Sequence, residues 1–175
     1  MSIYDELGAR VNENRLAYVD PVPLPGSMRS RQLYVSISIL SLLLGPWKDD
    51  DWSDRCSELE LDFDRYVTGQ YIAVRLPPSK DVEAFMAQLE PPEKNVWEIR
   101  SRDPEPQIRI LGFFAGKDCF VGLLWRYRSQ LNSNADWDAA MDECKAEWRK
   151  LFPVYDPPNL GASIHDYLSK NIYPV

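Results

Sequence analysis

Histidine and cysteine are scarce in this sequence. His165 is the only histidine among 175 residues, and the three cysteines, Cys56, Cys119 and Cys144, are far apart and form no Cys-x-x-Cys pair. An odd number of separated cysteines does not suit a disulfide framework, and a zinc site needs clustered cysteine and histidine ligands. We therefore expect no metal and no cofactor, and a reducing, cytoplasmic environment.

Long apolar runs are also missing. The most apolar stretch, residues 35–44, is interrupted by serines and is far shorter than the roughly 20 residues that cross a bilayer. The first ten residues carry acids, whereas a secretory signal needs basic residues followed by an apolar core. We expect neither a membrane span nor secretion by that route.

Common catalytic motifs are absent. The sequence has no Gly-x-Ser-x-Gly elbow, no Walker loop, no dinucleotide fingerprint and no metalloprotease motif. The glycines of residues 112–116 fall inside and at the end of a predicted strand rather than before a helix, so they do not predict a phosphate cradle. Cys119 would need a nearby base to act as a nucleophile, and the sequence identifies none.

The net charge of −7 argues against indiscriminate nucleic-acid binding, but the charge is unevenly placed. Residues 1–90 hold 9 Lys and Arg against 15 Asp and Glu, a balance of −6. Residues 91–135 hold 7 against 5, a balance of +2. A locally basic region therefore exists within an acidic chain.

Residues 96–131 contain three apolar stretches that predict a β-meander. In residues 96–100, Trp97 and Ile99 alternate with Val96, Glu98 and Arg100. In residues 108–111, Ile108 and Ile110 alternate with Arg109 and Leu111, and residues 120–125 are almost continuously apolar. Prolines and charges in residues 101–106 separate the first two strands, and a glycine-containing turn at residues 115–118 joins the last two. The three strands should therefore be consecutive and antiparallel.

The arginines of this meander fall at the strand ends. In an antiparallel meander, the end of the first strand, the start of the second and the end of the third lie along the same edge. We expect five guanidinium groups to gather there and call them the arginine rim, which consists of Arg100, Arg102, Arg109, Arg126 and Arg128.

The N-terminal third reads as a helical extension, residues 1–68. Apolar spacing predicts a helix over residues 2–17, and the prolines of residues 20–26 form a linker. A second helix should end at Leu44, although alternation around Val35 also fits a strand. A third should span residues 51–67, although residues 58–64 alternate like a strand.

Residues 69–152 are predicted to form an α+β core with a small antiparallel or mixed sheet. Its elements are a strand over residues 70–76, a short helix over residues 80–89, the meander, and a helix over residues 136–151. Residues 153–175 form a tail packed on this core, with a short helix near residues 163–170.

The Trp97-Glu-Ile-Arg100 strand, the Arg109-Ile-Leu strand, and an apolar strand with a basic and aromatic end followed by a helix resemble the RelE/HigB-like toxins. These are bacterial and phage-derived mRNA endonucleases of toxin–antitoxin pairs. The resemblance covers residues 70–152 and implies a RelE-like sheet, metal-independent cleavage of free or ribosome-bound mRNA, and a cognate antitoxin partner. These toxins commonly carry more helix between their first and second strands than is predicted here.

The resemblance also suggests roles for individual residues. Arg100 and Arg109 match the phosphate-contacting residues of the family, and Glu98 is a candidate base if it faces the same rim. The set implied as catalytic is Glu98, Arg100, Arg109, Arg126, Tyr127 and Arg128. Arg102 and Lys117 would add RNA contacts. The family often completes its site with a C-terminal histidine, lysine or tyrosine, and only His165 and Tyr167 are on offer here.

Several alternatives remain open. The arginine rim also fits a solvated sheet face that is ion-paired with Glu98, Asp103 and Glu105. The acidic residues 49–64 fit a solvated helix face better than a cation site, and they also fit a segment lying against the rim. A different class of function is a non-catalytic protein-interaction module of a phage-derived or defence-related system, which binds through the rim or the N-terminal helices.

Overall fold

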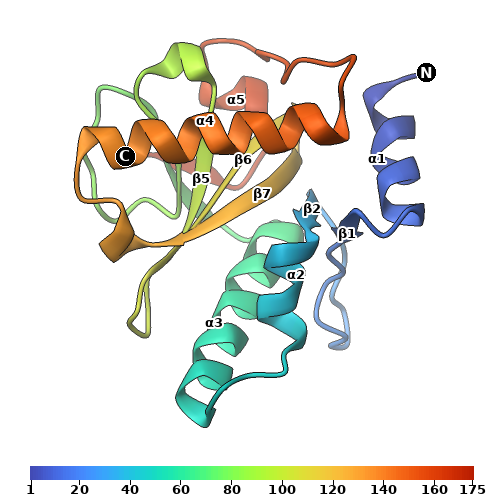
Figure 1. Cartoon of the computed structure of the whole chain (residues 1–175), viewed down its shortest axis with the longest axis vertical. Helices are drawn as coiled ribbons and strands as arrows, with labels where there is room; N and C mark the ends of the chain where they lie inside the picture. The colour runs from blue at the N-terminus through green and yellow to red at the C-terminus, as the bar shows by residue number, and fades with distance from the viewer.

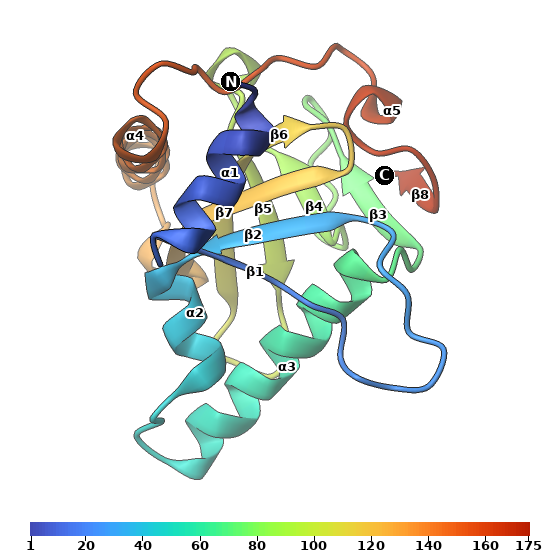
Figure 2. The ribbon, with the colours of Figure 1, turned by 90° about the vertical axis from the view of Figure 1, so that its right-hand side faces the viewer.

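The computed structural model describes all 175 residues and contains one mixed β-sheet with helices on both faces (Figures 1 and 2). The strand order is β1-β2-β7-β6-β5-β4-β3-β8. The strands are β1 (Leu16–Tyr18), β2 (Gln32–Ser36), β3 (Ile72–Arg75), β4 (Met86–Gln88), β5 (Trp97–Ser101), β6 (Ile108–Gly116), β7 (Cys119–Tyr127) and β8 (Ile172–Pro174). The helices are α1 (Ile3–Asn12), α2 (Ile37–Leu44), α3 (Asp50–Val67), α4 (Asn134–Leu151) and α5 (Ile164–Tyr167). The predicted α+β class is confirmed, and the sheet is larger than predicted.

The predicted meander forms the centre of the sheet. β5, β6 and β7 are antiparallel neighbours, and their register places Arg100 opposite Arg109 and Arg109 opposite Arg126. Where β6 meets β7 the register shifts after Leu111. A Cβ atom on Gly112 would lie 2.0 Å from the Val121 carbonyl oxygen, so this close approach of the two strands requires glycine.

Each face of the sheet carries its own hydrophobic core. On one face, α2, α3 and α5 pack against residues such as Trp97, Phe114 and Phe120. On the other, α1 and α4 pack against Leu111 and Phe113 (Figure 2). Because side chains alternate along a strand, the odd-numbered positions at the start of β6 face α4, and Arg109 shares that face with Leu111.

The predicted helical N-terminal extension is wrong in part, because two of its segments are strands of the sheet. The helix predicted over residues 2–17 ends at Asn12 and is followed by β1. The helix predicted to end at Leu44 is β2 followed by α2, with the Ser36 side chain accepting a hydrogen bond from Ile39 N at 3.4 Å. β2 pairs in parallel with β7, so long-range pairing determines its conformation rather than local propensity.

The helix predicted over residues 80–89 is also wrong. This region contains β4, which pairs with β3 on one side and β5 on the other. Ala84 through Ala87 are all buried, and such continuous burial suits a strand inside a sheet better than one face of a surface helix. Asp81 starts the preceding turn, where its side chain accepts a hydrogen bond from Glu83 N at 2.7 Å.

The two long helices are confirmed with small shifts at their ends. α3 begins after Asp49, whose side chain accepts a hydrogen bond from Trp52 N at 2.8 Å. α4 begins after Ser133, which forms a reciprocal capping box with Asp136. None of the helices combines the length and the apolar composition that crossing a membrane requires.

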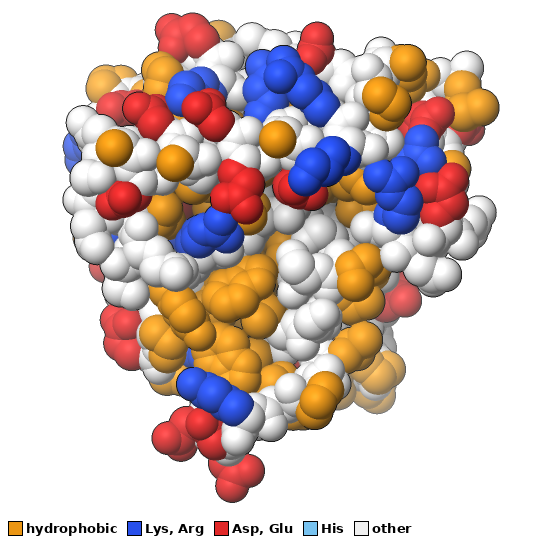
Figure 3. All heavy atoms as spheres, viewed as in Figure 1, with side chains coloured by type: hydrophobic (Ala, Val, Ile, Leu, Met, Phe, Trp, Pro, Cys, Tyr) orange, Lys and Arg blue, Asp and Glu red, His pale blue; other side chains and the backbone are white.

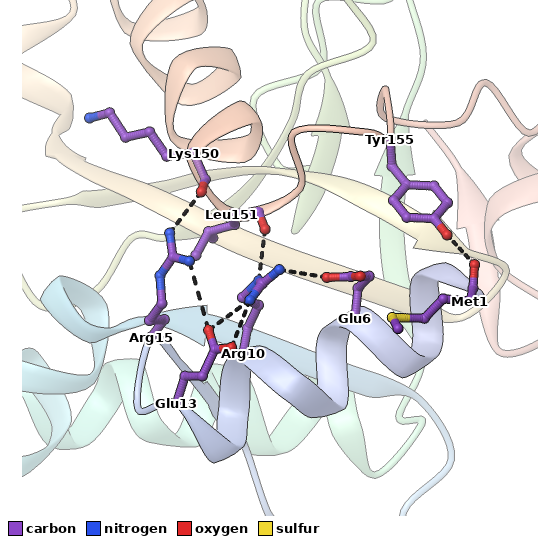
Figure 4. A network of polar contacts seen from close by, with 8 residues as sticks. All are labelled: Met1, Glu6, Arg10, Glu13, Arg15, Lys150, Leu151 and Tyr155. Atoms are coloured by element: carbon purple, nitrogen blue, oxygen red, sulfur yellow. Dashed lines mark hydrogen bonds and ion pairs between the residues drawn. The ribbon is translucent and has the colours of Figure 1, made fainter.

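α1 and the residues that follow it attach to the C-terminal end of α4 through two arginines (Figure 4). Arg10 Nε donates to Leu151 O at 2.8 Å, and Arg15 Nη2 donates to Lys150 O at 2.7 Å. The last carbonyls of a helix lack intrahelical partners and carry partial negative charge, so cationic donors stabilise them. Glu6 and Glu13 hold Arg10 in place at 2.6 and 2.7 Å.

Buried Arg31 connects the C-terminal segment to the rest of the fold. Its Nη1 donates to Tyr66 O and Gln70 O, both at 3.2 Å. Its Nη2 donates to Lys170 O at 2.9 Å and to Asn171 O at 3.2 Å. β8 then pairs with β3, so residues 153–175 contribute an edge strand to the sheet. The helix expected near residues 163–170 is the shorter α5.

Candidate functional site

A cavity of about 1150 Å³ lies on the α4 face of the sheet, beside the N-terminal half of α4. The ends of β3, β5 and β6 contribute to its lining, as do residues 77–93 and the first turns of α4. Its charged lining is made up of the basic residues Arg75, Lys80, Arg100, Arg102, Arg109 and Arg128 and the acidic residues Asp81, Glu83, Glu90, Glu93, Glu98 and Asp138. A cavity with this lining suits a charged, polar ligand.

Glu98 is at the centre of the buried part of this lining. Its Oε1 accepts a hydrogen bond from Arg100 Nε at 2.7 Å, and its Oε2 lies 3.4 Å from Arg109 Nε without a hydrogen-bond partner. The side chains of Glu98, Arg100 and Arg109 are 1%, 9% and 8% exposed. Two guanidinium groups thus share one carboxylate, and the cluster carries a net positive charge.

Arg75 adds a third guanidinium to the same region. Its Nε is buried and has no hydrogen-bond partner. Burial lowers the pKa of Arg75 and nearby Arg100 lowers it further, whereas the carboxylates of Glu98, Glu90 and Asp81 oppose both effects. Burial likewise lowers the pKa of Arg109 to about 10, against the opposing effect of Glu98. An anion bound here would offset this electrostatic cost, because it favours the charged form of each arginine.

The segment before β4 contacts the arginines at the cavity. Arg100 Nη1 donates to Asp81 O at 3.1 Å, and Arg102 Nη1 lies 2.7 Å from Glu83 Oε2. The segment that lies against the rim is therefore residues 81–83. The acidic residues 49–64 belong mainly to α3, which packs on the opposite face of the sheet.

The sequence-predicted site residues divide into three groups. Five of them line the cavity, namely Glu98, Arg100, Arg102, Arg109 and Arg128. Arg126 instead pairs with Glu143 of α4, and Tyr127 packs against Trp52 of α3 with ring centroids 5.9 Å apart. Lys117 is exposed in the β6–β7 turn. The shared strand register therefore does not bring all the predicted side chains together.

The expected ion pairs of the rim are found only in part. Glu98 contacts Arg100 and Arg109, whereas Asp103 and Glu105 pair with no arginine. The C-terminal candidates His165 and Tyr167 lie on α5 and do not line the cavity. His165 is exposed, and Tyr167 is buried in the core between the sheet and α5.

Two contributors to the cavity were missed by sequence reasoning. Arg75 was counted only as part of the strand over residues 70–76, although a charged residue at the end of an otherwise apolar strand is a signal of a polar neighbourhood. The segment of residues 81–83, which carries the acidic residues Asp81 and Glu83, was assigned to a helix. Their position depends on β4, which inserts between β3 and β5.

The remaining chemistry of the molecule is limited. No group of three or more His, Cys, Asp or Glu side chains is placed to hold a metal ion. Burial raises the pKa of Cys119 to about 12, so this thiol stays protonated near neutral pH. No family model, curated protein or solved structure matches the chain.

Proposed function

We propose that this chain is a RelE/HigB-like protein that binds RNA phosphate in the arginine-lined cavity and cleaves mRNA without a metal ion. The observation that carries the proposal is the buried cluster of Arg100 and Arg109 around the carboxylate of Glu98, two guanidinium groups to one carboxylate. Guanidinium groups bind phosphate oxygens through pairs of hydrogen bonds and keep their charge, so this excess favours a phosphate ligand.

The order of the elements supports the same proposal. β2 is followed by two helices, α2 and α3, and the chain later forms the β5–β7 meander and α4. The resembled toxins commonly carry more helix between their first and second strands than we predicted for this chain from its sequence. In the structure, β2 is followed by the helices α2 and α3, which supply such a helical segment. β3 and β4 are additional strands between these helices and the meander.

The cavity contains groups suited to the steps of RNA cleavage. Arg100 and Arg109 would bind the non-bridging oxygens of the scissile phosphate and stabilise the charge of the transition state. Glu98 Oε2, which is buried without a hydrogen-bond partner, would become accessible when RNA binds and would take the proton from the 2′-hydroxyl. The 2′-oxygen would then form a bond to phosphorus while the bond between phosphorus and the 5′-oxygen breaks, which leaves a 2′,3′-cyclic phosphate. Arg128 would stabilise the departing 5′-oxygen, which takes its proton from water.

A non-catalytic interaction module is the second candidate function. Arg100 and Arg102 already bind a backbone carbonyl and a carboxylate of residues 81–83, which are the groups that a partner peptide would present. A partner peptide that displaced this segment would accept hydrogen bonds from the same guanidinium groups of Arg100 and Arg102. This alternative predicts that the chain binds a ligand at the rim but does not cut RNA.

The test compares cavity arginines with arginines elsewhere on the surface. Labelled single-stranded RNA would be incubated with the full chain in the presence of EDTA, and both binding and cleavage would be measured. Arg75→Gln/Arg128→Gln should weaken binding about tenfold or more, because each lost phosphate contact lowers affinity and the salt dependence. The matched control, Arg65→Gln/Arg149→Gln, removes the same charge outside the cavity and should bind like the wild type.

Glu98→Gln separates binding from chemistry. The variant should bind RNA but cut it at least about a hundredfold more slowly if Glu98 is the base, as expected for a lost general base. Circular dichroism would verify that the variant is folded. RNA that is bound but not cut by the wild type would favour the interaction module, and failure to bind RNA would refute both steps.

A further inference from the structure

A second groove lies on the other side of α4. Its volume is about 730 Å³, and it is lined by the N-terminal end of α2, the C-terminal half of α4 and residues 123–127 of β7. Figure 3 shows a continuous apolar surface in the region between α4 and the α2–α3 pair. The groove shares none of its lining with the arginine-lined cavity. It is therefore a separate surface.

α2 is apolar on more than one side. Its sequence, ISILSLLL, buries Ile39 and Leu42 in the core, but Ile37 is 41% exposed and Leu44 is 68% exposed. Trp47 follows with 39% exposure. A surface helix normally keeps its apolar residues on the buried side, so this outward stripe indicates a surface that another molecule covers.

Aromatic side chains extend this surface from the groove towards α3. Trp125 and Tyr127 at the end of β7 and Trp52 in α3 are half-buried, with ring centroids 5.3 to 6.4 Å apart. Rigid aromatic residues with apolar faces are common anchors of protein interfaces. We call the area formed by Ile37, Leu44, Trp47, Trp52, Trp125 and Tyr127 the α2 surface.

The unpaired charge beside the α2 surface lies at one end and is negative overall, because four exposed aspartates outnumber Lys48, whose Nζ lies 5.5 Å from the centre of the Trp52 ring. Asp49, Asp50, Asp51 and Asp54 at the start of α3 are all exposed, and none of them makes an ion pair. Figure 3 shows acidic side chains at the lower tip of the molecule, where α3 begins in Figure 1. On the α4 side, Glu143 is neutralised by Arg126 and Glu147 by Lys150.

We propose that the α2 surface binds an amphipathic helix of a partner protein, with its apolar face in the groove and its basic end beside Asp49–Asp54. The groove has an aromatic floor formed by Trp125 and Tyr127 and a polar wall that includes Glu143, Glu147 and Lys150 of α4. It therefore suits an amphipathic helix that presents apolar side chains at helical spacing to the floor and polar side chains to this wall. The unpaired aspartates complement lysine or arginine at one end of that helix and fix its direction. The negative charge of these aspartates also repels an anionic membrane surface.

The probe is a synthetic amphipathic helix of about 18 residues, long enough to span the groove. One face carries leucine, and one end carries lysines. A second peptide replaces those lysines with glutamates. Anisotropy of the labelled peptides would be measured against the full-length chain, and we expect the lysine peptide to bind about tenfold more tightly than the glutamate peptide.

Two pairs of variants assign the binding to this surface. Asp50→Asn/Asp51→Asn/Asp54→Asn should abolish the preference for the lysine peptide, whereas the control Glu93→Gln/Asp103→Asn/Asp156→Asn removes equal charge elsewhere and should keep it. Ile37→Glu/Leu44→Glu should prevent binding. The control Tyr71→Glu/Val154→Glu alters exposed apolar residues that line neither the groove nor the arginine-lined cavity, and it should leave peptide binding unchanged.

Several outcomes would overturn the proposal. Failure of the lysine peptide to bind, or its undiminished binding to the folded Ile37→Glu/Leu44→Glu variant, would exclude the α2 surface. Self-association that this variant abolishes in sedimentation experiments would show that a second copy of the chain covers the surface. If the wild type binds phosphatidylglycerol vesicles as tightly as it binds the lysine peptide, and the Ile37→Glu/Leu44→Glu variant does not bind them, the α2 surface binds a membrane instead.

Discussion

Two arginine clusters are buried on opposite faces of β5. On the α3 face, Arg55 Nε donates to Pro106 O at 2.8 Å and its Nη2 donates to Ser101 O and Oγ at 2.9 and 2.7 Å. Ser101 Oγ in turn donates to Asp62 Oδ2 at 2.6 Å. On the α4 face, Arg100 and Arg109 lie around Glu98.

The two clusters differ in access and in charge balance. The Arg55 cluster uses one guanidinium to fasten the connection between β5 and β6 to α3, and neither Arg55 nor Ser101 lines the described cavities. The Glu98 cluster lines an open cavity and places two guanidinium groups around one buried carboxylate. Burial of an arginine is therefore not a mark of function by itself. Uncompensated charge at a cavity is the more informative feature.

The largest effect is expected from removing the acid of the cavity cluster. Glu98→Ala leaves Arg100 and Arg109 buried without a carboxylate and should lower the free energy of unfolding by about 3–5 kcal/mol. Urea unfolding followed by tryptophan fluorescence would measure the change. If the loss is below about 1 kcal/mol, water or a bound anion already balances these arginines, and the cluster is less enclosed than we infer.

A smaller loss of stability is expected from removing the arginine of the Arg55 cluster. Arg55→Ala removes three hydrogen bonds that hold the β5–β6 connection and should cost about 2–3 kcal/mol. RNA binding by the folded fraction should not change, because Arg55 does not line the cavity. Weaker RNA binding at unchanged stability would reverse the roles that we assign to the two clusters.

A pH titration between 8 and 9.5 tests a group outside both clusters. Burial raises the pKa of Cys119 from 9.0 to about 12, so the unfolded chain releases this proton at a pH where the folded chain keeps it. Stability should therefore fall as pH rises above 9, by about 1 kcal/mol at pH 9.5 from this thiol. Cys119→Ala should show a shallower decrease, and an unchanged slope would contradict the assignment.

The smallest effect on stability is expected at the edge of the cavity. Arg75→Gln should change the free energy of unfolding by less than about 0.5 kcal/mol, because the buried Nε has no partner to lose. The same variant should reduce the salt dependence of RNA binding by about one unit of slope. A large loss of stability with an unchanged salt slope would place Arg75 with the structural arginines.

The long elements and the short strand β3 could be predicted from the sequence, and the three-residue strands could not. α3, α4 and the meander carry apolar patterns over many residues, so local periodicity is sufficient to identify them. β1, β4 and β8 have three residues each, and β4 is defined by its neighbours β3 and β5. Their conformation follows from long-range pairing, which has no local signature.

The candidate site was accessible to sequence reasoning for the same reason. Glu98 and Arg100 alternate on one strand, and the predicted meander brings Arg109 beside them. The prediction for Tyr127 considered the edge of the sheet but not the face, because Tyr127 packs against α3. Arg126 shares the α4 face with Arg109, but it pairs with Glu143 of α4 instead of lining the cavity. The contribution of Arg75 depends on the placement of β3 beyond β4, which the sequence does not indicate.

The carbonyl cage around Arg31 has a consequence for synthesis on the ribosome. Two of its four acceptors, the carbonyls of Lys170 and Asn171, are made almost 140 residues after the arginine itself. Until they emerge from the exit tunnel, a collapsed chain would have to bury this cation with half of its partners missing, or keep it hydrated. Co-translational folding should therefore stop short of the native state, and a chain stalled before residue 170 should remain sensitive to proteases around α3 and β3.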